Sequence, residues 1–190
     1  MKDKKCRQCG KKFKQYCSTQ VVCSTKCAII KAKQDRIKKA KEDKEELLKI
    51  RKKKDELKTP RDLVKPAQAA VNSYVRERDY GDPCISSGKE MDWNKFGGAV
   101  DAGHFRSRGS APHLRFNLWN IHAQSVFENR YQSGNAISYR ANLIKKIGIE
   151  KVEWLEQNHE RRSFSKEYLK RITKIFRKRA RILKKRRELL

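Results

Sequence analysis

One stretch near the amino terminus constrains the fold more than any other. Residues 28–58, AIIKAKQDRIKKAKEDKEELLKIRKKKDELK, contain neither Gly nor Pro and consist mainly of good helix formers. Their apolar side chains are too sparse to form a stripe that a core would bury. We therefore expect a long, exposed, basic helix with partial coiled-coil character, which either contacts DNA or presents a solvated face. The hydrophobic core must then lie elsewhere in the chain.

The charge of the chain indicates a polyanionic partner. The 190 residues include 49 Lys and Arg against 22 Asp and Glu, a formal net charge of +27. Nucleic acid relieves the resulting self-repulsion, because neutralised phosphates release condensed counterions. A membrane surface is the rival partner, but no run of about 18 apolar residues is present to span a bilayer. We predict DNA as the partner and no membrane insertion. The start MKDKKCRQCG lacks the apolar region of a secretory signal, so we expect a cytoplasmic location.

The first 27 residues carry five of the six Cys. A reducing compartment favours metal ligation over disulfides, and two close Cys pairs joined by a short loop can wrap a tetrahedral zinc ion. We predict a structural Zn²⁺ bound by Cys6, Cys9, Cys23 and Cys27. Cys17 is then the spare thiol, and the alternative is a set of free thiols in a disordered basic tail. Because such a knuckle is too small to bury a core, the metal would supply its folding energy.

Changes in composition predict four parts. These are a zinc-binding knuckle over 1–27, a basic helix and linker over 28–66, a compact domain over 67–135 and a basic helical region over 136–190. Pro60 and Pro66 in TPRDLVKP are expected to end the long helix and form the linker. A short amphipathic helix, AQAAVNSYVRERDY, should follow the linker.

The carboxyl-terminal third is predicted to be helical. AISYRANLIKKIG and IEKVEWLEQNHE indicate two helices separated near Gly148. The last segment, SKEYLKRITKIFRKRARILKKRRELL, has apolar side chains at helical spacing, with a strongly basic opposite face that suits phosphate contact or a partner helix. Its apolar positions are Leu169, Ile172, Ile175, Phe176 and Leu183.

Polar residues gather in AVDAGHFRSRGSAPHLRFNLWNIHAQ, residues 99–124, which hold three of the four His. Asp101 precedes His104 by three residues with a Gly between, so both side chains can approach one point. A neutral imidazole can take a proton from water near pH 7, and a carboxylate can bind Mg²⁺. Together with Asn120 and Asn129 this pattern indicates phosphodiester hydrolysis, and the alternative is a polar loop over a small core. His113 and His122 are expected to have no catalytic role.

The segments DPCISSG, DAGHFRSRGSAPHLRFNLWNIHAQ and ENRYQSGNAISYRANLIKKIG resemble the NinG (Rap) recombination endonucleases of lambdoid phages. IEKVEWLEQNHERRSFSKEYLKRI and the paired Cys extend the resemblance over nearly the whole chain. It implies an α+β fold with a small ββα-metal (HNH-like) nuclease core, flanked by long basic helices and preceded by a zinc knuckle. It also implies an endonuclease that cuts branched recombination intermediates, including D-loops and Holliday-type junctions.

The resemblance also implies roles for residues. His104 would be the general base, and Asn120 would fix the loop that holds it. Asp101 and Asn129 would bind a catalytic Mg²⁺ or Mn²⁺. Phosphate contacts would come from guanidinium groups, which match phosphate geometry: Arg106, Arg108 and Arg130. A homodimer would bring two such sites to one junction.

The sequence departs from the family at a second set of paired Cys, whose positions here read Cys84, Ser87, Ser125 and Glu128. These side chains cannot make the closed thiolate site that structural zinc prefers, so we expect no second zinc. Aromatic packing is expected to replace it, through Trp93, Phe96, Phe105, Phe116, Trp119 and Phe127. Two other functions stay open: a non-catalytic accessory protein that binds branched DNA, and a generic HNH nuclease that cuts duplex DNA.

Overall fold

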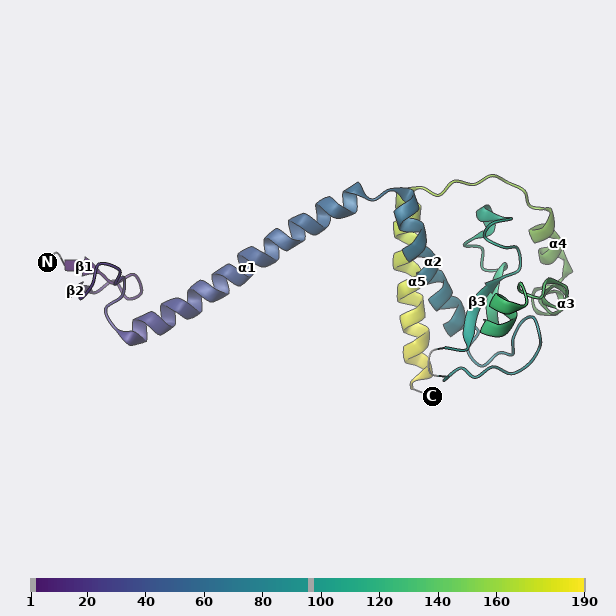
Figure 1. Ribbon diagram of the computed structural model, residues 1–190, viewed down its shortest axis with the longest axis horizontal. Helices are drawn as coiled ribbons and strands as arrows, with labels where there is room; N and C mark the ends of the chain where they lie inside the picture. The colour runs from purple at the N-terminus through teal and green to yellow at the C-terminus, as the bar shows by residue number, and fades with distance from the viewer. Residues whose placement is uncertain (1–2, 96–97, 190) are drawn as a thin grey trace. The chain divides into compact units, whose positions relative to one another are not determined.

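The computed structural model describes residues 3–95 and 98–189 and divides into two units, residues 1–57 and 58–190 (Figure 1). In the described residues, a two-stranded antiparallel sheet accompanies one long helix in the first unit and several helices in the second, so the prediction of a mixed α+β fold is confirmed at that level. Across the described ranges, no helix is both long and apolar enough to cross a membrane.

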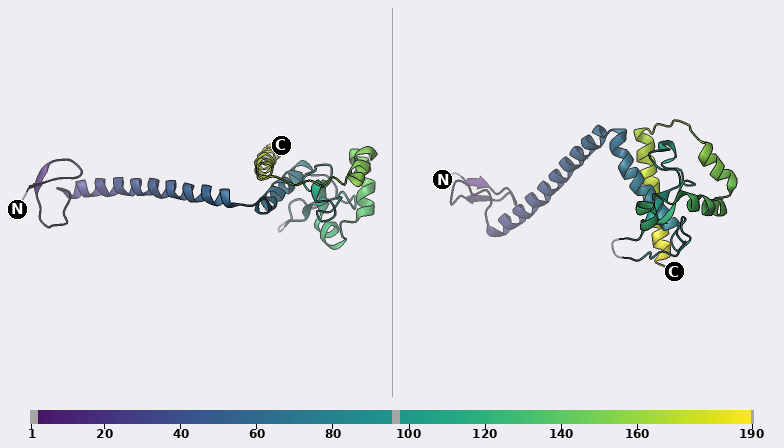
Figure 2. Two further views of the ribbon diagram at one scale, coloured as in Figure 1. Left: turned by 90° about the horizontal axis from the view of Figure 1, so that it is seen from above. Right: turned by 45° about the vertical axis from the view of Figure 1, so that its right-hand side comes forward.

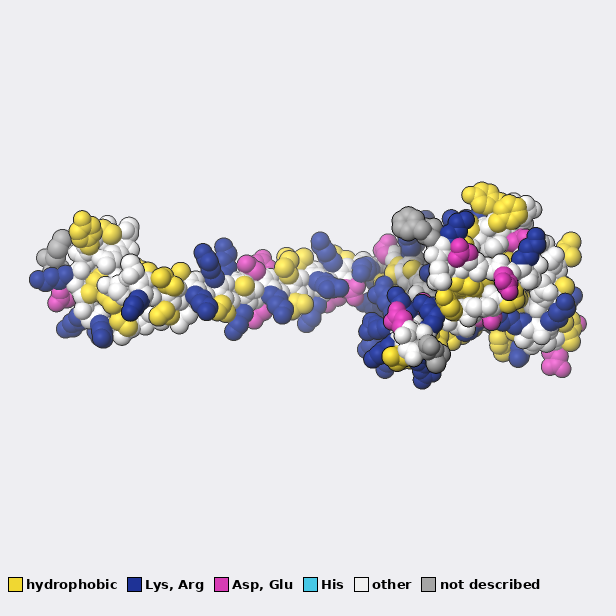
Figure 3. Space-filling model, turned by 90° about the horizontal axis from the view of Figure 1, so that it is seen from below, with side chains coloured by type: hydrophobic (Ala, Val, Ile, Leu, Met, Phe, Trp, Pro, Cys, Tyr) yellow, Lys and Arg dark blue, Asp and Glu magenta, His cyan; other side chains and the backbone are white. Residues whose placement is uncertain are grey.

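The amino-terminal unit begins with a small sheet. Strand β1 (Asp3–Lys5) pairs with β2 (Lys12–Lys14), and a Cys-containing loop then leads into helix α1 (Thr25–Leu57). Helix α1 confirms the predicted long helix, and none of its residues is buried. Figure 3 shows basic and acidic side chains alternating along it, and Lys31 pairs with Asp35 one turn away. Such pairs support a helix that has no core to pack against.

The second unit begins with helix α2 (Pro60–Arg78), which confirms the helix predicted from residue 67 but starts within the predicted linker. Thr59 Oγ1 accepts a hydrogen bond from the Asp62 backbone N–H, and Asp62 Oδ2 accepts one from the Thr59 N–H. This capping box, with Pro60 in the first turn, starts a helix. Pro66 removes one backbone hydrogen bond but does not end the helix, because the apolar face of α2 is packed on both sides of it. The long helix does end before Pro60, at Leu57, as predicted, but the linker predicted up to Pro66 is wrong because α2 runs through it.

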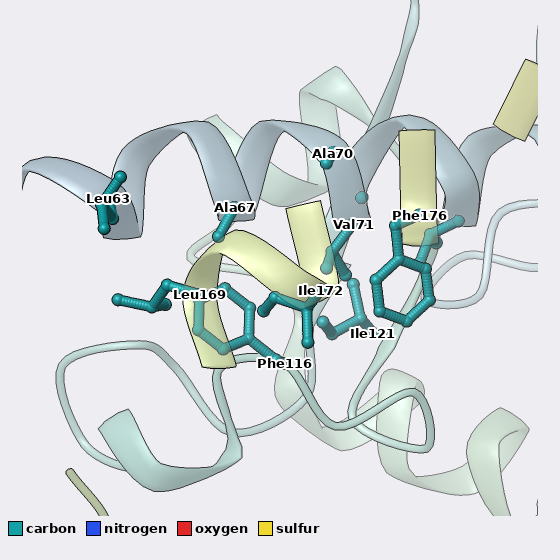
Figure 4. Packing of buried hydrophobic residues seen from close by; sticks show 11 residues of the cluster. Leu63, Ala67, Ala70, Val71, Phe116, Ile121, Leu169, Ile172 and Phe176 are labelled. Carbon is teal, nitrogen blue, oxygen red and sulfur yellow. The ribbon is translucent and has the colours of Figure 1, made fainter. Parts of the chain in front are cut away.

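Helix α5 (Lys166–Arg187) lies along α2, and the two helices share the main core. Figure 4 shows their apolar side chains meeting those of Phe116 and Ile121. The predicted apolar stripe of α5 is confirmed at Leu169, Ile172 and Phe176. The prediction is wrong for Ile175, which is 39% exposed, whereas Ala180 is buried.

A two-stranded sheet lies against α2 (Figures 1 and 2). Strand β3 (Val100–His104) is antiparallel to β4 (Ile121–Ser125), with Gly103 opposite His122. A Cβ atom at Gly103 would collide with the buried side chain of Gln124, which would have to shift to make room for any other residue. The connection between the strands contains the short helix η1 (Pro112–Leu114). A single π-helical turn, η2 (Phe127–Tyr131), follows β4.

Helices α3 (Ala136–Ile147) and α4 (Ile149–Gln157) confirm the two helices predicted around Gly148, whose φ is +88°. They enclose a second apolar cluster, formed by Ile85, Ala111, Leu114, Tyr139, Leu143, Val152 and Leu155. The Tyr139 hydroxyl donates to the Gly103 carbonyl at 3.1 Å, which ties this cluster to β3.

The aromatic residues expected to replace a second zinc behave differently from one another. Phe116 is buried in the main core, and Phe105 packs against the second cluster. Trp119 is 42% exposed and Phe127 is 59% exposed, so the prediction is wrong for these two. Trp93 is half-buried against the Tyr80 ring. Phe96 lies outside the described residues.

Candidate functional site

Four cysteines of the amino-terminal unit converge. The Sγ atoms of these residues all lie within 4.8 Å of one another: Cys6, Cys9, Cys23 and Cys27. The sulfur–sulfur distance is 3.5 Å from Cys9 to Cys23 and 3.7 Å from Cys23 to Cys27. Zinc–sulfur bonds of about 2.3 Å in a tetrahedron separate the sulfurs by about 3.8 Å. The cluster therefore fits the predicted zinc ion, and Cys17 lies outside it as expected.

The turn that carries the first Cys pair recurs in the second unit. Cys6 N–H donates to Lys11 O and Gly10 N–H donates to Cys6 O, both at 2.9 Å. Cys84 N–H likewise donates to Lys89 O, and Gly88 N–H to Cys84 O, both at 2.8 Å. Gly10 and Gly88 both have positive φ, +76° and +68°.

Hydrogen bonds stabilise this second turn. Ser87 occupies the place that Cys9 has in the first turn. The buried Cys84 Sγ accepts a hydrogen bond from the Ser125 N–H at 3.3 Å, and Ser125 Oγ accepts one from the Glu128 N–H at 3.2 Å. Three of the four positions of the expected lost zinc site thus take part in a hydrogen-bonded corner between the 84–89 turn and the start of η2.

A polar cleft of about 640 Å³ opens beside β3 and η2. Strand β3 contributes Asp101 and His104, and η2 contributes Asn129 and Arg130. Arg108, from the loop after β3, also lines it. The structure therefore brings together the predicted base, both predicted metal ligands and two of the three predicted phosphate contacts. Asn72, Ser107 and Ser133 also line the cleft, and no motif in the sequence singled them out.

Asp101 is held by two neighbours from η2. Its carboxylate accepts a bidentate pair of hydrogen bonds from the Arg130 guanidinium, at 2.8 and 2.9 Å, and a third from Asn129 Nδ2 at 2.9 Å. Partial burial by itself would raise the pKa of this carboxyl, but the hydrogen bonds from Arg130 and Asn129 outweigh it and lower the pKa. Asp101 is therefore an anion at neutral pH. The Asn129 amide needs only to turn over to present its oxygen beside the carboxylate.

His104 is held in one tautomer. Its Nε2 lies 3.1 Å from the Arg115 carbonyl oxygen. A carbonyl oxygen only accepts hydrogen bonds, so Nε2 carries the proton and Nδ1 has the free lone pair. Burial lowers the pKa of His104 to about 4, assisted by the positive charges of Arg108 and Arg115. The ring is therefore neutral at physiological pH and able to accept a proton at Nδ1.

Asn120 fastens the loop after β3. The side chain is fully buried, and its Oδ1 accepts a hydrogen bond from the Arg106 N–H at 2.7 Å. Its Nδ2 donates to the carbonyls of Arg106 and Leu114, at 3.0 and 3.3 Å. Asn120 thus joins the two ends of the 106–114 segment, and its part in holding a catalytic base stays a prediction.

Arg106 does not reach the cleft. Its guanidinium donates to the carbonyls of Leu155 and Glu156 in the last turn of α4, at 3.0 and 2.6 Å. These carbonyls have no partner within the helix, so a cation there caps the helix end. The predicted phosphate contact is replaced by this structural contact, which the sequence could not reveal because the residues are about 50 positions apart.

A buried charged cluster that the sequence did not reveal joins α2 to β4. Arg78 donates to Asp79 at 2.6 and 2.8 Å, and Asp79 Oδ2 accepts the Ala123 N–H at 2.9 Å. His122 Nδ1 lies 3.1 Å from the Arg78 guanidinium, and its Nε2 lies 3.1 Å from the Trp119 carbonyl. His113 contacts the Asn158 carbonyl at 2.9 Å. These contacts place His113 and His122 in the packing, outside the cleft.

The fold and the site define a class: a strongly basic α+β protein with a four-cysteine cluster and a polar cleft. The sequence profile of the family described as "Bacteriophage Lambda NinG protein" matches residues 1–188. The chain belongs to this family, so the resemblance to NinG proteins is confirmed.

Individual curated relatives of the chain support the same family. The chain is 46% identical over 111 residues to the protein ninG of Escherichia phage lambda, covering 57% of this chain and 51% of the relative. The corresponding protein of Enterobacteria phage H19B is 46% identical over 111 residues, covering 57% of this chain and 52% of the relative. That of Salmonella phage P22 is 44% identical over 111 residues, with coverages of 57% and 51%. The chain thus spans about half the length of the curated relatives it matches, and no solved structure matches it.

Proposed function

We propose that this protein is a metal-dependent, structure-selective DNA endonuclease that cuts branched recombination intermediates. One observation carries the proposal: a neutral His104 and an ionised Asp101 border the same cleft, together with Arg108 and Arg130. Phosphodiester hydrolysis needs a base for water, an anion for a divalent cation and positive charge for the phosphate. The pairing of β3 with β4, followed by η2, agrees with an HNH-like core.

His104 is the general base in this mechanism. Nδ1 takes a proton from water while the water oxygen attacks the phosphorus and the 3′-oxygen leaves. A pKa of about 4 makes the free imidazole a weak base. An anionic phosphate in the cleft raises that pKa, because a nearby negative charge stabilises imidazolium. The hydrogen bond to Arg115 keeps the ring oriented throughout.

Asp101 and Asn129 would hold Mg²⁺ or Mn²⁺, since a carboxylate and an amide oxygen suit hard cations. The ion would stabilise negative charge on the leaving oxygen. Arg130 now pairs with Asp101 through a side chain that is 60% exposed, so it is free to move to a phosphate oxygen. Arg108 provides a second guanidinium at the cleft.

Selectivity for branched DNA rests on shape and charge. Helix α5 packs its apolar face on α2 and leaves a row of exposed Lys and Arg along its outer face. Phosphates of one duplex arm can bind there while another strand enters the cleft. A homodimer would double these contacts and provide two cleavage sites for one junction.

A junction assay tests the proposal. A synthetic four-way junction is incubated with the full chain and Mg²⁺ or Mn²⁺, beside His104→Ala and the control His159→Ala, which changes an exposed His outside the cleft. We expect metal-dependent nicking by the wild type and by His159→Ala, with a loss of about 10²–10⁴-fold for His104→Ala. Equal cutting by His104→Ala, or an intact junction with the wild type, contradicts the mechanism.

The bidentate pair between Arg130 and Asp101 favours one alternative, because it uses the carboxylate that a metal would need. In that case the protein binds branched DNA without cutting it. This alternative predicts tight, salt-sensitive binding with no metal-dependent products. Competition between linear and branched DNA separates both functions from that of a generic HNH nuclease, which would cut linear duplex as readily.

A further inference from the structure

The aromatic rings of Phe127 and Tyr131 are exposed on η2, the turn whose Asn129 and Arg130 line the cleft. We propose that they form a stacking platform for an unpaired base of the DNA, so that this platform selects branch points. This inference rests on the proposed function, because it names the part of the branched DNA, an unpaired base, that binds at the turn lining the cleft.

Both rings belong to η2, the turn that lines the cleft. Asn129 and Arg130 lie between them in the sequence and contact Asp101. Phe127 is 59% exposed and Tyr131 is 73% exposed, with ring centroids 6.2 Å apart and planes tilted by 32°. Other aromatic rings of this unit, such as Phe116, Phe164 and Tyr168, pack against one another around the main core. Phe127 and Tyr131 form an exposed pair instead.

The platform is firmly positioned. Ser125 Oγ accepts the Glu128 N–H at 3.2 Å, and the Gly134 N–H donates to the Glu128 carbonyl at 2.9 Å. Ser133 and Asn135 have positive φ values of +49° and +45°, which is uncommon for residues with a side chain. A π-helical turn and such backbone conformations recur at functional sites, where the surrounding structure maintains them.

The charges on and near η2 indicate what kind of partner stacks on the two rings. Arg130, which lines the cleft, directly precedes Tyr131 in η2, and the single acidic residue of η2, Glu128, accepts a hydrogen bond from Asn135 Nδ2 at 3.1 Å. A partner with a flat apolar face and an adjacent negative charge complements this surface, and a nucleotide has both. Bases within a duplex are covered by their neighbours, whereas an unpaired base at a branch exposes its face.

The test measures binding, with Ca²⁺ in place of Mg²⁺ to suppress cutting. Fluorescence anisotropy gives the Kd of the full chain for a four-way junction with unpaired bases at the branch and for a linear duplex of equal length. We expect Phe127→Ala and Tyr131→Ala to weaken junction binding roughly tenfold and duplex binding less than twofold. Tyr131→Phe keeps the ring and should retain wild-type binding. Tyr16→Ala, which removes a ring 93% exposed in the other unit, is the matched control.

A second readout identifies the contact directly. The junction carries 5-iodouracil at an unpaired branch position, and the cross-linked peptide is mapped by mass spectrometry. We expect cross-links to Phe127 or Tyr131, and none there when the label lies in the middle of an arm. Equal losses for junction and duplex, or cross-links only to other residues, overturn the proposal. A dimer that is lost in Phe127→Ala, with unchanged DNA preference, also overturns it, because the rings would then bind a second copy.

These outcomes are separable from those of the proposed function. A protein that binds junctions through the rings but never cuts them contradicts the nuclease and supports the platform. A protein that cuts junctions with unchanged preference in the two alanine variants supports the nuclease and contradicts the platform.

Discussion

His104 Nε2 lies 3.1 Å from the carbonyl oxygen of Arg115, and this hydrogen bond determines which ring nitrogen can act. Both residues flank the loop that Asn120 fastens. His104 and the loop beside it therefore form one structural unit.

Cleavage should persist at mildly acidic pH. Burial lowers the pKa of His104 to about 4, so in the free protein the imidazole stays neutral well below its ordinary pKa of about 6.5. We expect kcat/KM for junction cleavage to fall as pH drops through about 4 to 5, with no loss near 6.5. A pH profile with saturating Mn²⁺ measures this, and a midpoint near 6.5 would show that the ring is solvated.

His104 also makes the stability of the fold depend on pH. The pKa of His104 is lower in the folded than in the unfolded chain, so the unfolded chain binds more protons between pH 6.5 and 4. The contribution of His104 to stability is therefore lost over that range as the pH falls. The loss from His104 is at most about 3.5 kcal/mol, the free energy that corresponds to a pKa lowered from 6.5 to about 4. Burial also lowers the pKa of His122, which acts in the same direction. Urea unfolding at several pH values tests this, and His104→Gln should flatten the slope.

Asp101→Asn should separate binding from cutting. Without the carboxylate the divalent cation loses its anionic ligand, and cutting should fall roughly 100-fold or more. DNA binding should be retained or strengthened, because a negative charge is removed and Arg130 loses its partner. The control is Asp82→Asn, which changes an acid that pairs with Lys146 outside the cleft. If Asp101→Asn cut as well as the wild type, the metal would bind elsewhere.

Asn120→Ala should destabilise the second unit. The substitution leaves the partly buried Arg106 N–H and carbonyl without their partner, at a cost of roughly 1–3 kcal/mol. We expect a lower Tm in a thermal unfolding scan and weaker cutting even at low temperature, because the loop is no longer fixed. Asn120→Asp places a buried carboxylate against the carbonyls of Arg106 and Leu114, so its Tm should be no higher than that of Asn120→Ala. An unchanged Tm would show that contacts other than those of Asn120 hold the loop in place.

About one zinc ion per chain is expected by elemental analysis, bound by the cluster of four Cys. Cys9→Ser should abolish zinc binding, and Cys17→Ser, outside the cluster, should retain it. Chelation should unfold the knuckle while the circular dichroism of helices in residues 58–190 persists. Two ions per chain would mean that the turn at Cys84 binds metal as well.

Local patterns predicted the helices well, because propensity and periodicity act over a few residues. Helices α1, α3 and α4 were predicted in this way. Pro66 was read as a helix break, but the packing of α2 against α5 overrides one missing hydrogen bond. The Asp101 and His104 pair was visible from spacing. The capping role of Arg106 and the exposure of Phe127 depend on distant segments, so only the folded structure reveals them.

The pairing of α2 with α5 has a practical consequence for dissecting this protein. The apolar layer behind strand β3 is completed by Leu169 and Phe176, near the far end of the sequence. An excised piece covering only residues 67–135 would expose Val71 and Ile121 to water and should aggregate. The smallest fragment worth expressing therefore keeps everything from Lys58 onward.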